Sequence, residues 1–337
     1  MKPAVLSTRL TKLFGTTHPI LGGGLMWLSD AAYVGALTNA GCMGFITTRS
    51  FSDDAALREQ LRRCREIAQG RPFGVNLTLS GRPDANAALQ GSLAVALDEG
   101  VRHFETAGQA PADLITAIHA QGGVVIHKAS SLRHALAGQT AGADAVAIVG
   151  MEEGGHPGAN ELPTMMLGAL ALARGMFDVP LVLGGGIGHG CQIAAALALG
   201  ADGVLMGSRF MTCDEISSHH TYKAHLIACD EHSTIRLLHT LGNTWRVLRN
   251  ETAQRVDAIE RAGTAGYADF GNLLDSKVAR DHCYGEGKWQ QGMLSLGPAI
   301  GFAMDIRPLA AIVEELVQQA RAALARLPQL TQPTSPT

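Results

Sequence analysis

Eight short apolar runs, each followed by a turn and then by apolar residues at helical spacing, leave few folds open to this chain. Runs of this kind that alternate with helices are typical of parallel strands covered by helices. Eight strand–helix units close most economically into an α/β fold, the (β/α)8 or TIM barrel, which is the fold that we predict. The predicted strands are Pro19–Gly24, Met43–Thr47, Pro72–Leu77, Val101–Thr106, Val124–His127, Ala143–Val149, Val179–Leu183 and Gly203–Met206.

The alternation stops after Arg209. Residues 215–290 carry charge-mixed helical patterns, His219–Glu231 and Leu248–Arg261, so we predict a helical insertion after strand 8 on the substrate side. A last helix, Pro308–Leu327, follows it. The predicted organisation is a barrel of residues 1–214 plus 291–330, the insertion at 215–290, and a flexible tail at 331–337.

Composition argues against several classes of partner. The 337 residues hold 27 Lys and Arg against 30 Asp and Glu, a net charge of −3 without a basic block, which disfavours nucleic acid. No run approaches about 18 uninterrupted apolar residues, and residues 1–7 lack an apolar signal core, so we expect no membrane partner. Six scattered cysteines without metal-ligand spacing favour idle thiols in a cytoplasmic protein.

Glycines follow the last two predicted strands. Gly184, Gly185 and Gly186 end the seventh strand, and Gly207-Ser208 ends the eighth. In a barrel these two loops commonly form a phosphate site, because glycines leave backbone N–H groups unobstructed. Neither this cluster nor Gly22–Gly24 has the G-x-G-x-x-G spacing of a dinucleotide fold, so a mononucleotide or a sugar phosphate fits better. The alternative is a pair of glycine-rich turns without a ligand.

Other residues with chemical potential also follow predicted strands, at the edge where barrel enzymes work. The paired glycines of Gly22–Gly24 would admit a flat ring close to the backbone. Asn76 offers both a donor and an acceptor to a ring edge, and Lys128 offers positive charge where negative charge develops.

His156 is the predicted catalytic residue. It lies in the glycine-rich loop Gly150–Gly158, where a core role for an imidazole is unexpected, and it could accept a proton or hydrogen-bond an anion. The alternative is a turn histidine that faces water. The histidines of the insertion lack an H-E-x-x-H pattern and clustered carboxylates, so we predict no metal site.

Taken together, the motifs resemble one family. His18-Pro19-Ile20, Gly23-Gly24, Gly41-Cys42-Met43-Gly44, Pro72–Leu77, Gly154–Gly158, Gly184–Ile187 and Met206–Phe210 occur in the order found in the nitronate monooxygenases, formerly 2-nitropropane dioxygenases. The resemblance runs from about residue 8 to 320. The sequence is especially similar to the bacterial branch that contains FMN-dependent NADH:quinone reductases, which shares the stretch from Asp230 to Val247.

The resemblance implies an FMN-containing TIM barrel. By position, the phosphate would be held by Gly184, Gly185, Gly186, Gly207 and Ser208. The flavin would be bound by Gly22, Gly23, Gly24, Asn76, Lys128 and Gly155. His156 matches the family's active-site histidine. Two departures, Gly22 and the pair Glu152-Glu153, lie near the expected substrate space.

The resemblance implies oxidation of an alkyl nitronate by O2 to a carbonyl compound and nitrite. Its first rival is an NAD(P)H-dependent reductase of a quinone or an enoyl thioester on the same flavin scaffold, since a fold does not decide among these reactions. Two further alternatives are a non-redox barrel that isomerises or cleaves a sugar phosphate, and an FMN-binding protein without turnover. A homodimer is compatible with each.

Overall fold

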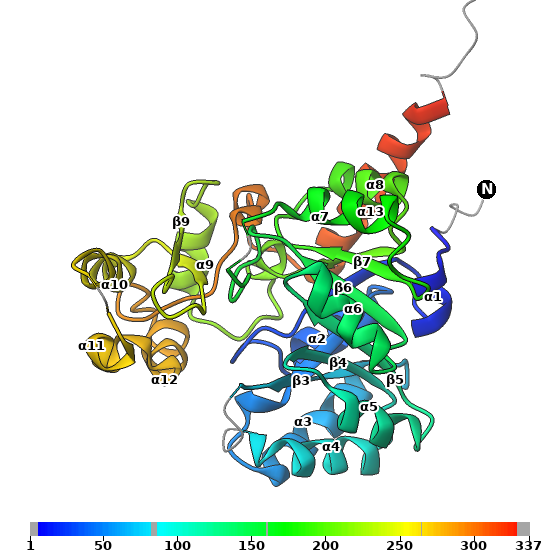
Figure 1. Ribbon diagram of the computed structural model, residues 1–337, viewed down its shortest axis with the longest axis horizontal. Coiled ribbons are helices and arrows are strands. Elements are labelled where there is room, and N and C mark those ends of the chain that lie inside the picture. The colour runs from blue at the N-terminus through cyan, green and yellow to red at the C-terminus, as the bar shows by residue number, and fades with distance from the viewer. Residues whose placement is uncertain (1–5, 82–85, 160, 264, 329–337) are drawn as a thin grey trace, which may run out of the picture.

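Eight parallel strands close into a barrel in the computed structural model, which describes residues 6–81, 86–159, 161–263 and 265–328 (Figure 1). The barrel closes because β1 pairs with β8 as well as with β2. This confirms the predicted (β/α)8 fold; the predicted tail at 331–337 lies outside the described residues. The strands are β1 (Ile20–Gly22), β2 (Met43–Thr47), β3 (Gly74–Leu79), β4 (His103–Gly108), β5 (Val124–Ala129), β6 (Ala145–Val149), β7 (Leu181–Gly184) and β8 (Gly203–Met206).

Helices cover the outside of the barrel, and α3 (Asp54–Ile67) shows why they form. The Asp53 carboxylate accepts a hydrogen bond from the Ala56 N–H and so caps the helix start. Leu57, Leu61 and Cys64 then return at helical spacing and are buried. The other barrel helices are α1 (Arg9–Phe14), α2 (Ala31–Asn39), α4 (Leu89–Asp98), α5 (Ala112–His119), α6 (Leu132–Thr140), α7 (Thr164–Ala173), α8 (Gly190–Leu199) and α13 (Leu309–Arg326), with the 3-10 turns η1 (Thr48–Ser50) and η3 (Ser208–Phe210).

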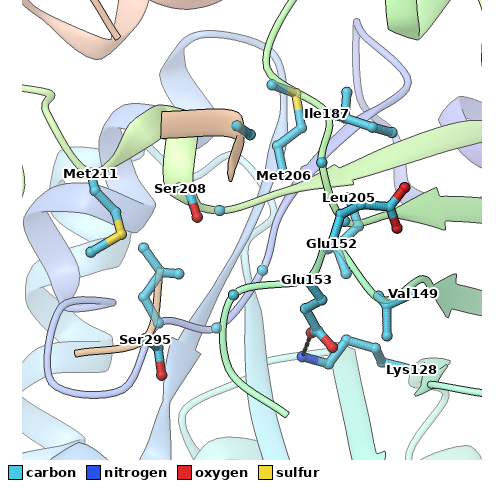
Figure 2. Close-up of a pocket in the computed structure, with 18 residues that line it drawn as sticks. Lys128, Val149, Glu152, Glu153, Ile187, Leu205, Met206, Ser208, Met211 and Ser295 are labelled. Atoms are coloured by element: carbon cyan, nitrogen blue, oxygen red, sulfur yellow. Dashed lines mark hydrogen bonds and ion pairs between the residues drawn. The ribbon is translucent and has the colours of Figure 1, made fainter. Parts of the chain in front are cut away.

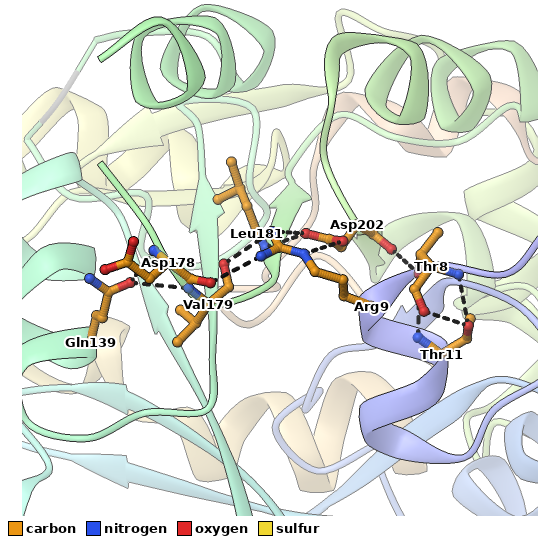
Figure 3. Close-up of polar contacts among 8 residues, drawn as sticks. All are labelled: Thr8, Arg9, Thr11, Gln139, Asp178, Val179, Leu181 and Asp202. Carbon is orange, nitrogen blue, oxygen red and sulfur yellow. Dashed lines mark hydrogen bonds and ion pairs between the residues drawn. The ribbon is translucent and has the colours of Figure 1, made fainter. Parts of the chain in front are cut away.

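The barrel interior is filled by side chains and is not a channel. Phe45, Ile126 and Leu205 belong to this inner cluster, and Leu10 and Phe14 of α1 join it from the amino-terminal end of the strands. Helix α1 is held there by polar contacts (Figure 3). Arg9 Nε and Nη2 donate to the Asp202 carboxylate at 3.0 and 2.7 Å, and Asp202 Oδ2 also accepts from the Leu181 N–H at 3.0 Å. The opposite end, where the carboxyl ends of the strands lie, is left for ligands.

A second lobe, residues 215–302, lies beside the carboxyl ends of the strands (Figure 1). It has an apolar cluster of its own, which includes Leu237, Val247, Val256 and Phe270. Its elements are α9 (His220–Ile227), β9 (Thr234–Leu237), β10 (Trp245–Leu248), α10 (Glu251–Arg261), α11 (Tyr267–Phe270), the 3-10 turn η4 (Gly271–Leu274), α12 (Ser276–Val278), the π-helix η5 (Ala279–Gly285) and the 3-10 turn η6 (Pro298–Phe302).

The lobe is not wholly helical, contrary to our expectation. β9 and β10 pair as an antiparallel hairpin, and the predicted helix Leu248–Arg261 begins only at Glu251. The hairpin is stable because Leu237 and Val247 are buried in the lobe cluster. In the described part of the chain, no helix combines the length and the apolar character needed to cross a membrane.

Candidate active site

A pocket opens at the carboxyl ends of the barrel strands (Figure 2). Its walls come from the loops that follow β1, β6, β7 and β8, from the end of β5, and from a segment of the second lobe. Seven of the residues predicted from the sequence line it: Gly23, Gly24, Lys128, Gly185, Gly186, Gly207 and Ser208. The fold therefore brings together residues that are up to 185 positions apart in the sequence (208 − 23).

The remaining predicted residues, Gly22, Asn76, Gly155, Gly184 and His156, lie outside this lining. A Cβ on Gly22 would lie 2.3 Å from Leu37 Cδ1 of α2, so this glycine is required by helix packing on the outer face of β1. Asn76 lies behind Gly24, where a Cβ on Gly24 would come within 2.9 Å of it. Asn76 is buried, and its Oδ1 accepts from the Thr78 hydroxyl at 3.0 Å.

The loop after β7 adopts a conformation that glycine favours. Gly185 and Gly186 have φ values of +95° and +73°, where a side chain is strained. A Cβ on Gly186 would also lie 2.9 Å from Glu152 Cβ. The Thr164 hydroxyl donates to the Gly184 carbonyl at 2.7 Å and so ties this loop to the start of α7. The backbone of Gly185 and Gly186 therefore lies close to the loop after β6, with no side chain between them.

Backbone N–H groups gather on this side of the pocket. Within the residues that the structure describes, the N–H groups of Gly185, Gly186, Gly207 and Ser208 donate to no protein acceptor. The Ser208 hydroxyl accepts from the Gly297 N–H at 2.8 Å, which leaves its own proton free to donate. Unpaired N–H groups that converge on one place form a cradle for an anion, and a phosphate is the group that suits it.

The opposite side of the pocket carries charge. Lys128 Nζ lies 2.9 Å from Glu153 Oε1 and 3.8 Å from Glu105 Oε1 (Figure 2). Glu105 is 1% exposed, and its Oε2 accepts from the Gly24 N–H at 3.3 Å. Burial raises the pKa of Glu153, which Lys128 opposes and Glu105 reinforces. The two carboxylates raise the pKa of Lys128 despite its burial. Two acids thus share one ammonium group.

Glu152, the neighbour of Glu153, points elsewhere and has a structural part to play. Its carboxylate accepts from the Thr164 N–H, at 3.0 Å for the nearer oxygen. It thereby satisfies an N–H group at the start of α7, which has no side-chain cap from Pro163. Of the two acids in this loop, Glu153 is the one that reaches Lys128.

His156 lies at the seam between the barrel and the second lobe. Its ring stacks on Trp245 of β10, with centroids 5.1 Å apart, and Nδ1 lies 3.2 Å from the Thr244 carbonyl oxygen. A carbonyl can only accept, so Nδ1 carries the proton and Nε2 is the unprotonated nitrogen of the neutral ring. The side chain is exposed, but the protein around it disfavours the charged form and lowers the pKa of His156. The hydrogen bonds to the Thr244 carbonyl and the Asn243 side chain oppose this shift, and Lys128 adds to it. His156 is therefore suited to accept a proton.

The seam itself was not predicted. Gly155 and Arg246 exchange two backbone hydrogen bonds, of 3.0 and 2.7 Å, and Arg246 Nε donates to the Met151 carbonyl. Ser295 and Ala299 line the pocket from the second lobe. Neither residue has a chemical signature in the sequence, because each serves by position alone. Glu153 carried the one usable signal, as a departure from the family pattern.

The six cysteines are free, and four of them are buried: Cys42, Cys64, Cys213 and Cys283. Among the residues with a described position, no three His, Cys, Asp or Glu side chains gather in a way that could hold a metal ion.

Three relatives resemble the chain closely enough to compare. A Mycobacterium tuberculosis enzyme named (3aS,4S,5R,7aS)-5-hydroxy-7a-methyl-1-oxo-octahydro-1H-indene-4-carboxyl-CoA dehydrogenase is 31% identical over 258 residues, which cover 76% of this chain and 70% of that one. FabK from Thermotoga maritima superposes with a TM-score of 0.86 at 29% identity, over 96% of this chain and 99% of that one. A nitroalkane oxidase from Streptomyces ansochromogenes has a TM-score of 0.78 at 25% identity, over 95% and 100%.

The family model described as nitronate monooxygenase matches residues 7–319. This span includes all eight barrel strands, the second lobe and most of α13. It confirms the resemblance drawn from the motifs. The chain belongs to the nitronate monooxygenase family and is an enzyme of the oxidoreductase class.

Proposed function

We propose that this protein is an FMN-dependent reductase of an α,β-unsaturated acyl thioester, with NAD(P)H as the electron donor. The observation that carries the proposal is the charged wall of the pocket, where Glu153 and Glu105 outnumber the ammonium group of Lys128. Two acids on one ammonium group leave no net positive charge to bind an anionic substrate. The proton that such a pair retains suits a neutral substrate that takes up a proton as well as electrons. A nitronate is an anion, whereas an enoyl thioester is neutral at its reacting carbons.

The residues present fit FMN. The N–H cradle at Gly185, Gly186, Gly207 and Ser208 would hold its phosphate, and Gly23 and Gly24 would let a flat ring approach the backbone. When bound, FMN supplies the exchange of a hydride equivalent between a nicotinamide and a substrate. Lys128, held by two carboxylates, would donate hydrogen bonds to oxygen at the ring edge or on the substrate.

The similarity to a CoA-ester dehydrogenase supports the thioester as substrate class. That enzyme acts, by its name, on a carboxyl-CoA compound, and it is at least as similar in sequence to this chain as the two solved structures compared above. A thioester carbonyl acidifies the neighbouring carbon, so reduction next to it needs a hydride at one carbon and a proton at the other. The pocket offers acids for the second of these.

The experiment is an anaerobic reduction of the purified yellow protein, followed through the flavin absorbance at about 450 nm. NADH or NADPH is expected to bleach the band, and addition of crotonyl-CoA to restore it. A saturated analogue, butyryl-CoA, is the matched control and is expected to restore nothing. A colourless protein would contradict the proposal that FMN is bound. A bleached protein that crotonyl-CoA cannot reoxidise would contradict the proposal that the substrate is an enoyl thioester.

A second candidate is oxidation of nitronates with O2, and the orientation of His156 favours it. Because Nδ1 is engaged by the Thr244 carbonyl, the unprotonated Nε2 of a neutral imidazole could remove a proton from a nitroalkane. The same apparatus distinguishes the two candidates. Bleaching by ethyl nitronate in the absence of NAD(P)H would support the nitronate reaction, and bleaching by NAD(P)H alone would support the reductase.

A further inference from the structure

Glu153 has no part in the anion cradle, yet its side chain forms part of the pocket wall. Figure 2 shows Glu153 and Lys128 pointing toward one another on this wall, joined by one ion pair. Lys128 Nζ contacts Oε1; within the described residues Oε2 has no protein donor, and the side chain keeps 13% of its surface exposed. One oxygen of Glu153 is therefore anchored, and the other is open to a ligand of the pocket.

The groups around this carboxylate favour a retained proton. Among the residues that the structure places, Glu105 Oε1 is buried without a hydrogen-bond partner, and it lies 3.8 Å from the same ammonium group. With both acids ionised, the trio would carry a net negative charge in a wall shielded from water. Two carboxyl groups that share one site cannot both ionise readily, so the pair tends to keep one proton.

The other charged groups nearby do not cancel this charge. Glu152 is held by Thr164, and Arg246 is directed to the Met151 carbonyl and the Thr234 hydroxyl. His156 has its Nδ1 proton on the Thr244 carbonyl and adds no positive charge when neutral. Burial and Glu105 both raise the pKa of Glu153, in the direction that retains the proton.

We infer that Glu153 is the proton donor of this enzyme, with Lys128 as the residue that positions it. The inference rests on the proposed thioester reduction. In that reaction the β-carbon of the C=C bond receives a hydride equivalent that originates from NAD(P)H. The O–H bond of Glu153 breaks, its proton forms the new C–H bond at the α-carbon, and the carboxylate regains a proton from water. One NAD(P)H and one proton are consumed for each saturated thioester formed.

His156 is poorly placed for this task, which makes the assignment specific. Its proton is on Nδ1 and is committed to a backbone carbonyl, and its lowered pKa leaves Nε2 unprotonated near neutral pH. A neutral imidazole in this tautomer accepts a proton and does not donate one from Nε2. The acid, Glu153, thus lies in the charged wall of the pocket, and the base, His156, lies at the seam between the barrel and the second lobe.

The test separates the two half-reactions of the FMN-loaded protein in a stopped-flow instrument. In Glu153→Gln, reduction by NAD(P)H is expected to stay close to the wild-type rate, while reoxidation by crotonyl-CoA falls by about 10²-fold or more. Glu286→Gln, which alters an exposed ion-paired acid of the second lobe, is the matched control and is expected to change neither rate. Glu153→Asp is expected to restore part of the reoxidation rate.

A second readout does not depend on turnover. Infrared difference spectra recorded across a pH titration of the oxidised FMN-loaded protein are expected to contain the carbonyl band of a protonated carboxylic acid, absent in Glu153→Gln. If the Glu153→Gln variant does not fold, the same measurements on Glu105→Gln test the proposal. Without the carboxylate of Glu105, Lys128 pairs with Glu153 alone, which lowers the pKa of Glu153. As the pH rises, the band and the reoxidation rate should therefore both be lost at a lower pH than in the wild type.

The outcomes discriminate between the two proposals. If wild-type protein is reoxidised by crotonyl-CoA and Glu153→Gln keeps that rate, the reductase stands and the proton donor is wrong. An equal fall in both half-reactions also overturns the assignment, because it indicates a structural role. If crotonyl-CoA does not reoxidise the wild type at all, the proposed function falls, and the proton-donor assignment falls with it.

Discussion

At the residue scale, two consecutive glycines decide whether the anion cradle can exist. Gly185 and Gly186 combine positive φ with close neighbours, so both conformation and space oppose a side chain. Gly175 also has a positive φ, +57°, but a Cβ there would meet nothing within 4 Å. The two sites separate the cost of backbone strain from the cost of filling the cradle.

We therefore predict different results for Gly186→Ala and Gly175→Ala. Each is expected to lose about 1–2 kcal/mol of folding free energy through left-handed strain, measured by urea unfolding. Gly186→Ala is also expected to bind FMN at least about 10-fold more weakly, because its Cβ displaces Glu152 and narrows the cradle. Fluorescence titration of the apoprotein measures this affinity. Equal FMN affinity in the two variants would mean that the phosphate binds elsewhere.

His156 yields a prediction that depends on which reaction the enzyme performs. His156→Asn retains an N–H group that can reach the Thr244 carbonyl but removes Nε2. Turnover of a neutral nitroalkane is then expected to fall by about 10²-fold, because the base is lost. Reduction of crotonyl-CoA and the FMN content are expected to stay at the wild-type level. A matching loss with crotonyl-CoA would place His156, and not Glu153, on the thioester route.

At the scale of elements, strand β5 carries a histidine that must remain neutral. His127 is 1% exposed, and its Nδ1 lies 3.0 Å from the Thr106 hydroxyl of β4. Burial lowers its pKa to about 4, against 6.5 for a free imidazole. The packing is tight, because a Cβ on Gly138 of α6 would lie 2.4 Å from the ring. Protonation of His127 thus opposes the contact between β5 and α6.

This histidine predicts how stability changes with pH. As the pH falls from about 6.5 to about 4, the unfolded chain takes up a proton that folded His127 refuses, so the free energy of unfolding decreases. Its share is about 3 kcal/mol, and the stability is fully present above pH 6.5. Urea unfolding of His127→Asn is expected to show a shallower loss over this range. His232→Asn, an exposed histidine, serves as control and should retain the wild-type slope.

Most barrel elements could be predicted because their burial pattern is written in the sequence. β2 and β8 begin and end where predicted, since each is a continuous buried run. Strand β4 begins at His103 instead of Val101, a shift that apolar runs alone cannot reveal. The hairpin of the second lobe escaped prediction because Arg236 and Arg246 lie opposite one another, which weakens the strand signal. Each arginine has a partner outside the hairpin. Arg236 forms an ion pair with Glu161, and Arg246 donates a hydrogen bond to the Met151 carbonyl.

At the scale of the whole molecule, the candidate site divides into a predictable half and an unpredictable half. The barrel half follows from a general rule, that loops after parallel strands meet at one edge, and glycines mark them in the sequence. The other half depends on how the second lobe returns to the barrel. The Gly155–Arg246 contact, the His156–Trp245 stack and the Gly297–Ser208 hydrogen bond join segments with no shared pattern. Only tertiary structure brings them together.

The late position of Ser295 and Ala299 has a consequence for how the protein matures. All eight barrel strands, the last of which ends at Met206, are synthesised before this wall of the pocket. A nascent chain can therefore complete its strand pairing while its pocket is still incomplete. A fragment cut short before residue 295 would lack one wall of the pocket.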